Sequence, residues 1–199
     1  MSIAVTAGPA LPYTLIGEFP GPERYRFKTS DGPRTFGKAV HIAVSSTRIF
    51  VGTADSFTVE VFDLQARPVG TIRWGAQARR FTEEDKAAYA GRAAWTLASA
   101  AQQQRMRDAV NAMQFPEFLP PYDRFLVDDA ERLWVQQANA PTHRRRLWWG
   151  FDAAGAMVAM LDVPREFLLL QLSATEALGT WTDDDGVESV RSFAVVRPQ

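Results

Sequence analysis

The chain has 199 residues, of which 46% are hydrophobic and 12% aromatic, and its formal net charge is −1. This length usually corresponds to one domain, and the near-neutral charge argues against a general nucleic-acid-binding protein, which would be strongly basic. Cysteine is absent, which excludes disulfides, thiolate metal sites and a cysteine nucleophile.

Extended chain is predicted for the first part of the sequence. In residues 1–39, the segments "YTLIGEF" and "RYRFKT" are strand-like and are separated by "PGP". Residues 40–74 predict four short strands, because each is rich in β-branched or aromatic residues and the links carry Ser, Gly, Asp or Pro. These strands are His41–Val44, Arg48–Gly52, Thr58–Asp63 and Val69–Arg73.

A helical insertion is predicted within residues 77–119. Its body, "TEEDKAAYAGRAAWTLASAAQQQRMRDAVNAM", has almost no β-branched residues. Thr82 is a good N-cap, and the three acidic residues after it place negative charge where the helix dipole favours it. We expect one long helix, with Gly91 as the place for a break, ended by the prolines of "PEFLPPY".

Two further groups of strands are predicted after the insertion. Residues 122–163 again give four strands, and residues 166–197 give three, in "LLLQLS", "ALGTWTD" and "VESVRSFAV", with a "DDG" turn before the last. The strands of the four-stranded group lie near Phe125–Val127, Leu133–Gln136, Leu147–Phe151 and Met157–Asp162.

The strand groups repeat one pattern. "FDLQARPVGTI" at Phe62–Ile72 and "FDAAGAMVAML" at Phe151–Leu161 have Phe-Asp, a turn and an apolar run in the same order. First strands begin near Ile42, Phe125 and Leu169, and the last two lie 44 residues apart, within the period of about 40–50 residues typical of β-propeller blades. The first interval is about twice as long because of the insertion.

The repeat predicts an all-β fold with one helical insertion, built from β-propeller blades that are stable only when stacked on one another. One partial propeller domain would comprise blades at residues 40–74, 122–163 and 166–197, the insertion at 77–119, and the outer part of a preceding blade at 1–39.

Three segments resemble bacterial six-bladed β-propeller proteins of the TolB-like and NHL-like kind: "PPYDRFLVDDAERLWVQ", "WGFDAAGAMVAMLDVP" and "ALGTWTDDDGVESVRSFAV". In that family Asp-x-x-Gly-x-Leu-Trp-Val recurs, followed by Phe-Asp-x-x-Gly. The resemblance covers about residues 36–197 and looks like the C-terminal half of such a protein. It implies a fold and says little about function. Ala130 and Glu131 stand where the family has glycine nearby, so we expect a distorted turn there.

The predicted two and a half to three blades are fewer than the about 4–8 that close a propeller. An open half-ring would expose two apolar blade faces, and such faces seek partners. Either two copies form a homodimer that completes a six-bladed ring, or the missing half-propeller is a separate product. We favour the homodimer.

One face of the predicted propeller gathers several loops. Strand direction alternates within a blade, so the link between strands 2 and 3 shares a face with the link to the next blade. The insertion is such a link, and it should lie beside Gly52–Phe57, Ala138–Arg146 and Thr182–Gly186. Binding residues usually lie on loops held by a rigid scaffold, so we expect the functional face here.

The candidate ligand-binding residues lie in two of these loops. Arginines at 144–146 could bind a carboxylate or phosphate, with a tryptophan as stacking platform, although a solvated hairpin with the tryptophans in blade interfaces is favoured. The acidic turn could offer oxygens to a hard cation, but Asp-Asp-Gly is ordinary hairpin chemistry, so no metal site is predicted. The candidates are Arg144, Arg145, Arg146, Trp148, Asp183 and Asp184.

Two functions remain open. The preferred one is a non-catalytic binding or scaffold module without a cofactor, which recognises a small molecule or a protein on its loop face. The alternative is a propeller hydrolase or lactonase with a divalent cation at the channel mouth, where Asp128 and Asp129 would serve unless they form a β-turn. No nucleophile elbow, phosphate-binding loop, zinc-protease or dinucleotide motif supports an enzyme.

No apolar run approaches the about 18 residues of a membrane span, and the N-terminal residues lack the basic and apolar regions of a signal peptide. These features predict a cytoplasmic protein, or an exported one if the chain is part of a larger precursor.

Overall fold

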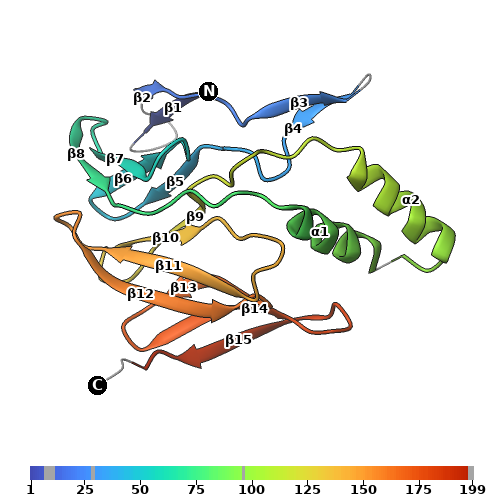
Figure 1. The fold of residues 1–199 in the computed structure, drawn as a ribbon. Coiled ribbons are helices and arrows are strands. Elements are labelled where there is room, and N and C mark those ends of the chain that lie inside the picture. The colour runs from blue at the N-terminus through green and yellow to red at the C-terminus, as the bar shows by residue number, and fades with distance from the viewer. Residues whose placement is uncertain (7–11, 28–29, 96, 197–199) are drawn as a thin grey trace.

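The computed structural model describes residues 1–6, 12–27, 30–95 and 97–196. Within them, the chain forms antiparallel sheets in which each strand pairs with its neighbours in sequence, and two helices interrupt the series (Figure 1). Two hairpins come first: β1 (Ser2–Val5) with β2 (Thr14–Glu18), and β3 (Arg24–Phe27) with β4 (Ser30–Pro33).

Three larger sheets follow. Sheet I comprises β5 (His41–Val44), β6 (Arg48–Gly52), β7 (Thr58–Asp63) and β8 (Pro68–Arg73). Sheet II comprises β9 (Tyr122–Val127), β10 (Leu133–Gln137), β11 (Arg145–Phe151) and β12 (Met157–Pro164). Sheet III comprises β13 (Phe167–Leu172), β14 (Glu176–Thr182) and β15 (Glu188–Ala194). The prediction of a mainly β chain with a helical insertion is confirmed.

The insertion contains two helices where one was expected, α1 (Glu83–Trp95) and α2 (Ala100–Asn111). Gly91 lies inside α1, so the prediction of a break there was wrong. The chain turns instead just before Ser99, whose side chain accepts a hydrogen bond from Gln102 N while the Gln102 side chain bonds back to Ser99 N. This reciprocal capping starts a new helix and so ends the long one.

Sheet II lies between sheets I and III (Figure 1). Its first strand, β9, contacts the first strands of both neighbours, β5 and β13. Side chains alternate between the two faces of a strand, and Trp148 and Trp149 use this alternation: Trp149 packs against sheet I, and Trp148 packs against sheet III. Adjacent tryptophans are therefore both buried, because sheet II is covered on both faces.

One turn geometry recurs where the sequence repeats Asp-x-x. In each turn the aspartate Oδ1 accepts hydrogen bonds from the backbone N–H groups two and four residues later, and the residue three positions on has a positive φ. That residue is glycine in two turns but Ala66 (φ 64°) in one and Glu131 (φ 61°) in another. The prediction that the turn at Glu131 is distorted was therefore wrong. The four aspartates are Asp63, Asp128, Asp152 and Asp183.

The two outer faces of the stack differ. Part of the face of sheet I that points away from sheet II is covered by the β1–β2 hairpin, where Ile3 packs against Ile49, Val51 and Phe62. Ile42 (44% exposed) and Val44 (60%) lie on the same face outside this cover. On the corresponding face of sheet III, Val190 is 74% exposed, and all seven residues of β15 are exposed. The two outer faces expected to be open are therefore partly covered at the sheet I end and open at the sheet III end.

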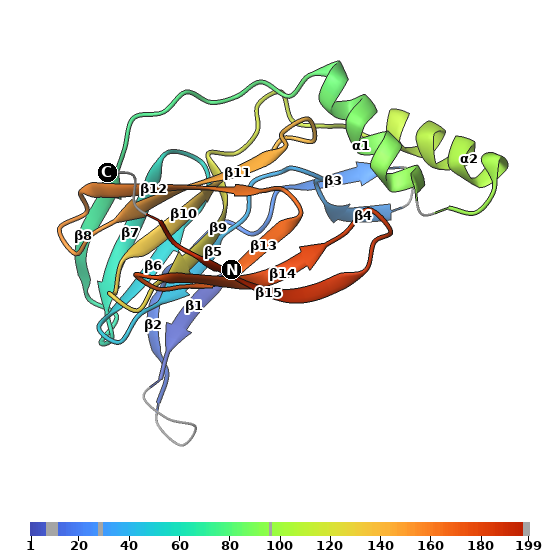
Figure 2. The same ribbon diagram turned by 90° about the horizontal axis from the view of Figure 1, so that it is seen from below.

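The helices lie at one end of the stack, beyond the ends of the strands (Figures 1 and 2). Thr82 caps α1, because its Oγ1 accepts a hydrogen bond from Asp85 N at 3.2 Å. In the part of the chain described, neither helix is long and apolar enough to cross a membrane.

Candidate functional site

A hollow of about 780 Å³ lies between α1 and the adjoining ends of sheets II and III. We call it the insertion-face hollow. Three arginines line it from separate parts of the fold: Arg92 from α1, Arg146 from the start of β11, and Arg165 from the link between β12 and β13. Trp95, 76% exposed at the end of α1, also lines it.

A buried ion pair fixes α1 beside the hollow. Asp85 has no exposed surface and accepts hydrogen bonds from Arg79 at 2.7 Å and from Thr142 Oγ1 at 2.6 Å. Burial alone would raise the pKa of Asp85, but the hydrogen bonds from Arg79, Thr142 and Thr82 outweigh it and hold the pKa well below its ordinary value. The first turn of α1 is thereby joined to the β10–β11 loop, as expected for segments on one face.

Arg165 holds the same loop from the other side. Its Nη1 donates to the backbone oxygens of Ala140 at 2.9 Å and His143 at 3.0 Å. Burial, with repulsion from Arg92 and Arg146, lowers the pKa of Arg165 to about 10. Arg92 and Arg146 are therefore close enough to destabilise the charge on Arg165, and an anion among the three guanidinium groups would relieve that repulsion.

Arg92 and Arg146 lack acceptors within the described ranges. Neither side chain forms a hydrogen bond or an ion pair there, and the Nε atom of Arg146 is buried without a partner. Burial lowers the pKa of both guanidinium groups. Buried hydrogen-bond donors are normally paired. The unpaired guanidinium group of Arg146 therefore indicates that a ligand in the hollow could supply an acceptor.

The opposite side of the hollow is acidic. Asp183 and Asp184 in the β14–β15 turn and Glu188 at the start of β15 line it, and the hydroxyl groups of Thr180 and Thr182 lie nearby. Glu166 also lines the hollow, but close to the arginines, where its charge partly offsets the lowering of the pKa of Arg146 and Arg165. With four acidic and three basic side chains, the hollow as a whole does not favour a ligand with many negative charges.

A second polar group adjoins Arg146. Asp123, at the start of β9, accepts hydrogen bonds from Gln136 Nε2 at 2.7 Å and from Asn139 N at 3.0 Å. Solvent reaches the Asp123 side chain, yet desolvation by the surrounding protein outweighs these hydrogen bonds and the nearby Arg146 charge and raises the pKa of Asp123 to about 6. The buried Gln136 Oε1 and Asn139 Oδ1 have no partner among the described residues.

The three arginines predicted as one binding cluster have different surroundings. Only Arg146 lines the hollow. Arg144 is exposed and contributes its backbone oxygen to a hydrogen bond from Arg165 N. Arg145 pairs with Asp162 on β12 at 2.6 Å. Trp148 has no exposed surface, so its ring offers no face to a ligand and serves the packing of sheets II and III.

The acidic candidates have separate roles. Asp183 and Asp184 both line the hollow, but one oxygen of Asp183 closes the β14–β15 turn, as the hairpin interpretation expects. Asp128, considered for catalysis, is buried and bonds Arg132 at 2.7 Å and the Trp134 indole at 2.8 Å. Asp128 thus belongs to a turn and to the core rather than to an open channel.

Sequence reasoning missed Arg92, Trp95, Arg165 and Asp123. Nothing in the local sequence around Arg92 or Arg165 distinguishes them from solvated arginines, because their proximity arises from the packing of α1 on sheets II and III. Asp123 did carry a signal: it is an acidic residue near the start of a first strand, "YDRFLV", that ends in an apolar run.

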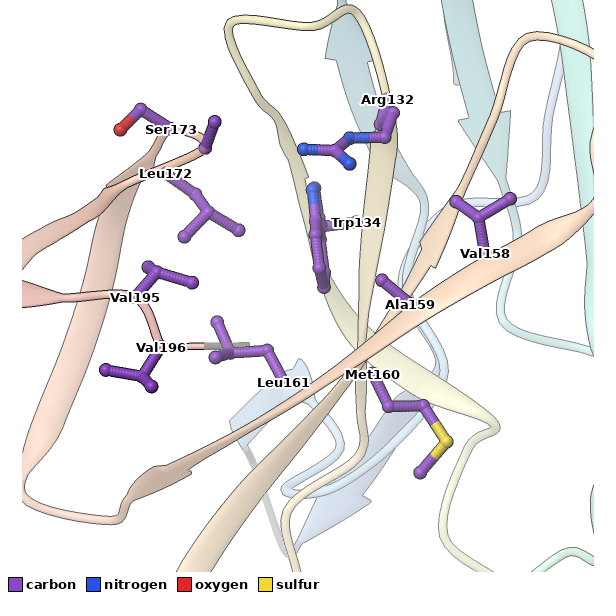
Figure 3. Close-up of a pocket in the computed structure, with 11 residues that line it drawn as sticks. Arg132, Trp134, Val158, Ala159, Met160, Leu161, Leu172, Ser173, Val195 and Val196 are labelled. Atoms are coloured by element: carbon purple, nitrogen blue, oxygen red, sulfur yellow. The ribbon is translucent and has the colours of Figure 1, made fainter. Parts of the chain in front are cut away.

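A separate apolar hollow of about 420 Å³ lies between sheets II and III, away from the helices. Leu161 of β12, Leu172 of β13 and Val195 after β15 converge on it beside Trp134 (Figure 3). It has few polar groups, so we do not assign ligand recognition to it.

A scan against protein-family models finds no match for the chain, and a search of curated proteins finds none either.

Proposed function

We propose that sheets I, II and III are three blades of an open β-propeller, and that this module binds a small anionic ligand in the insertion-face hollow. The adjacency of β5, β9 and β13 supports the first part, since the first strands of successive blades adjoin around a propeller axis. Completion of the ring by a second copy or by a separate half-propeller stays a prediction.

The observation that carries the binding proposal is the pair of guanidinium groups, on Arg92 and Arg146, that face one hollow without an acceptor among the described residues. Guanidinium groups bind carboxylates and phosphates through two parallel hydrogen bonds. The acidic side of the hollow restricts the ligand to one anionic group on an otherwise neutral or cationic body. A flat ring could stack on the exposed Trp95.

Isothermal titration calorimetry with phenyl phosphate, inorganic phosphate and citrate tests this function. Phenyl phosphate should bind most tightly, because it combines one anionic group with a ring, and citrate most weakly. Arg146→Gln should weaken phenyl phosphate binding by about 10- to 100-fold, the loss expected for hydrogen bonds between charged groups. Arg144→Gln is the matched control and should bind like the unaltered protein, since Arg144 lies outside the hollow.

The proposal fails if phenyl phosphate gives no binding heat at about 10 mM, a concentration that detects even a millimolar dissociation constant, or if both variants lose affinity equally. The hydrolase or lactonase alternative has no observation in its favour: in the described ranges, no group of three or more His, Asp or Glu side chains could hold a metal ion.

A further inference from the structure

The outer edge of sheet III lacks the irregularities that protect the outer edges of sheets I and II. Pairing of β8 with β7 shifts at an extra residue, Val69, and that of β12 with β11 shifts at Val158. β8 also begins with Pro68 and β12 ends with Pro164. β15 pairs with β14 in seven consecutive positions without a shift, and all seven residues of β15 are exposed. Bulges and prolines are how proteins prevent edge strands from pairing.

The backbone of β15 presents a row of hydrogen-bonding groups to this edge. Asp183 N donates to Val187 O, and Val195 N donates to Thr175 O, so the odd-numbered residues of β15 face β14. Backbone groups alternate in direction along an antiparallel strand. Those of Glu188, Val190, Ser192 and Ala194 therefore point away from the sheet.

Space for a further strand exists beside β15. Sheets I and II each have four strands, whereas sheet III has three in the described part of the chain. Two hollows, of about 420 and 240 Å³, lie between β12 and the end of β15. They leave Leu161 and Phe193 partly exposed, where a fourth strand would supply cover (Figure 3 shows Leu161).

We propose that β15 pairs antiparallel with β15 of a second copy, about a two-fold axis at Val190. The charges on the strand select this register. An axis at Arg191 would place two guanidinium groups opposite each other, which is destabilising, and an axis at Ser192 would leave Glu188 beyond the end of the partner strand. The axis at Val190 places Val190 opposite Val190, Glu188 opposite Ser192, and Val187 opposite Phe193.

The second copy suits this edge better than an unrelated strand. In the chosen register, Val190 (74% exposed), Val187 (60%) and Phe193 (42%) all gain apolar partners, and no like charges face each other. The net charge of −1 causes little repulsion between copies. This dimer joins edges, not blade faces, and it is independent of any ligand in the insertion-face hollow.

Sedimentation equilibrium over about 1–200 µM tests the assembly, since a single paired strand gives an interface at the small, weakly associating end of the range. The average mass should rise from 22.2 kDa toward twice that value. Val190→Pro should remain monomeric, because it removes an N–H that points to the partner, and proline is tolerated at a free edge. Its thermal unfolding at low concentration should match that of the unaltered protein, which shows that the variant still folds.

Single cysteines test the register, since the chain has none of its own. Val190→Cys should form a disulfide-linked dimer on mild oxidation, because residues on the axis have Cα atoms about 5.5 Å apart. Val187→Cys is the matched control: the two copies of that position would lie about 20 Å apart and should not link. A constant 22.2 kDa mass, a dimer that survives Val190→Pro, or equal linking of both cysteines would each overturn the proposal.

Discussion

The two ends of the three-sheet stack finish differently although the sheets have the same strand order. At the sheet I end, the β1–β2 hairpin covers part of the outer face, and the outer strand begins with a proline and contains a bulge. At the sheet III end, the face is open and the outer strand is regular and exposed. The repeated sequence pattern therefore specifies how the sheets pack on one another, whereas the structure at the two ends of the stack depends on residues outside that pattern.

The largest loss of stability is expected at the interface between sheets II and III. Trp134 is 5% exposed, and its indole donates to Asp128 at 2.8 Å. Trp134→Ala should lower the free energy of unfolding by about 3–5 kcal/mol, the usual cost of removing a buried large aromatic side chain. Urea denaturation measures it. Trp95→Ala, at an exposed position, should change stability by less than about 0.5 kcal/mol; a loss below about 1 kcal/mol at Trp134 would contradict the packing described.

A smaller loss of stability is expected where the β1–β2 hairpin packs on sheet I. Ile3→Ala should lower the free energy of unfolding by about 2 kcal/mol, because Ile3 is 8% exposed and packs against sheet I. At the other end, Val190→Ala should change the stability of the dilute monomer by less than about 0.5 kcal/mol. Equal losses at the two positions, measured by urea denaturation, would mean that the ends are not different.

The two ends also build the same turn from different residues. The left-handed position is Ala66 in the β7–β8 turn and Gly186 in the β14–β15 turn. Ala66→Gly should stabilise the protein by up to about 1 kcal/mol, because glycine removes steric strain at a positive φ but costs unfolded-state entropy. Gly186→Ala should destabilise it by about 1 kcal/mol. Thermal unfolding of the two variants measures both effects. Shifts of the same sign in the two unfolding temperatures would contradict the prediction.

A pH-dependent effect is predicted in sheet II, between the two ends. Desolvation by the surrounding protein raises the pKa of Asp123 to about 6, above the about 3.9 of an unfolded aspartate. Between about pH 4 and 6 the folded state therefore holds more protons, so this group's contribution to stability falls as pH rises through that window.

Asp123→Asn should remove that fall without affecting the opposite trend due to Asp85, whose lowered pKa stabilises the fold above pH 4 and is lost as pH falls. The difference in unfolding free energy between the unaltered protein and this variant isolates the effect. A difference that is constant from pH 4 to 7 would show that the Asp123 pKa is not raised.

Much of the strand arrangement was predictable, because period-2 apolar patterns and turn residues are local signals. The strands of sheets I and II and the cap at Thr82 follow directly from them. The break before Ser99 was harder to predict. The surrounding alanine-rich run favours one continuous helix, and only Ser99 and Gln102 indicate a new helix start. Ile3 lies in a short apolar segment, "IAV", and nothing local indicates that this segment packs on sheet I.

The candidate site was predictable only in part. Placing the insertion and the loops on one face led to Arg146, Asp183 and Asp184, all of which line the hollow. Trp148 was a poor candidate for a physical reason that strand alternation provides: in a sheet covered on both faces, neither of two adjacent tryptophans is open. Arg92 and Arg165 come near Arg146 through tertiary packing, which no local pattern encodes.

The pairing of each strand with its sequence neighbours affects how the chain reaches its structure. All strands of sheet I lie within residues 41–73, so its strand pairing needs no later strand. Such low contact order lowers the entropic barrier to forming each sheet. During synthesis, sheet I can therefore assemble while the insertion is still emerging. The apolar inner face of sheet I is covered only once β9–β12 have been synthesised. The time taken to translate the helices therefore sets how long that face is exposed and able to aggregate.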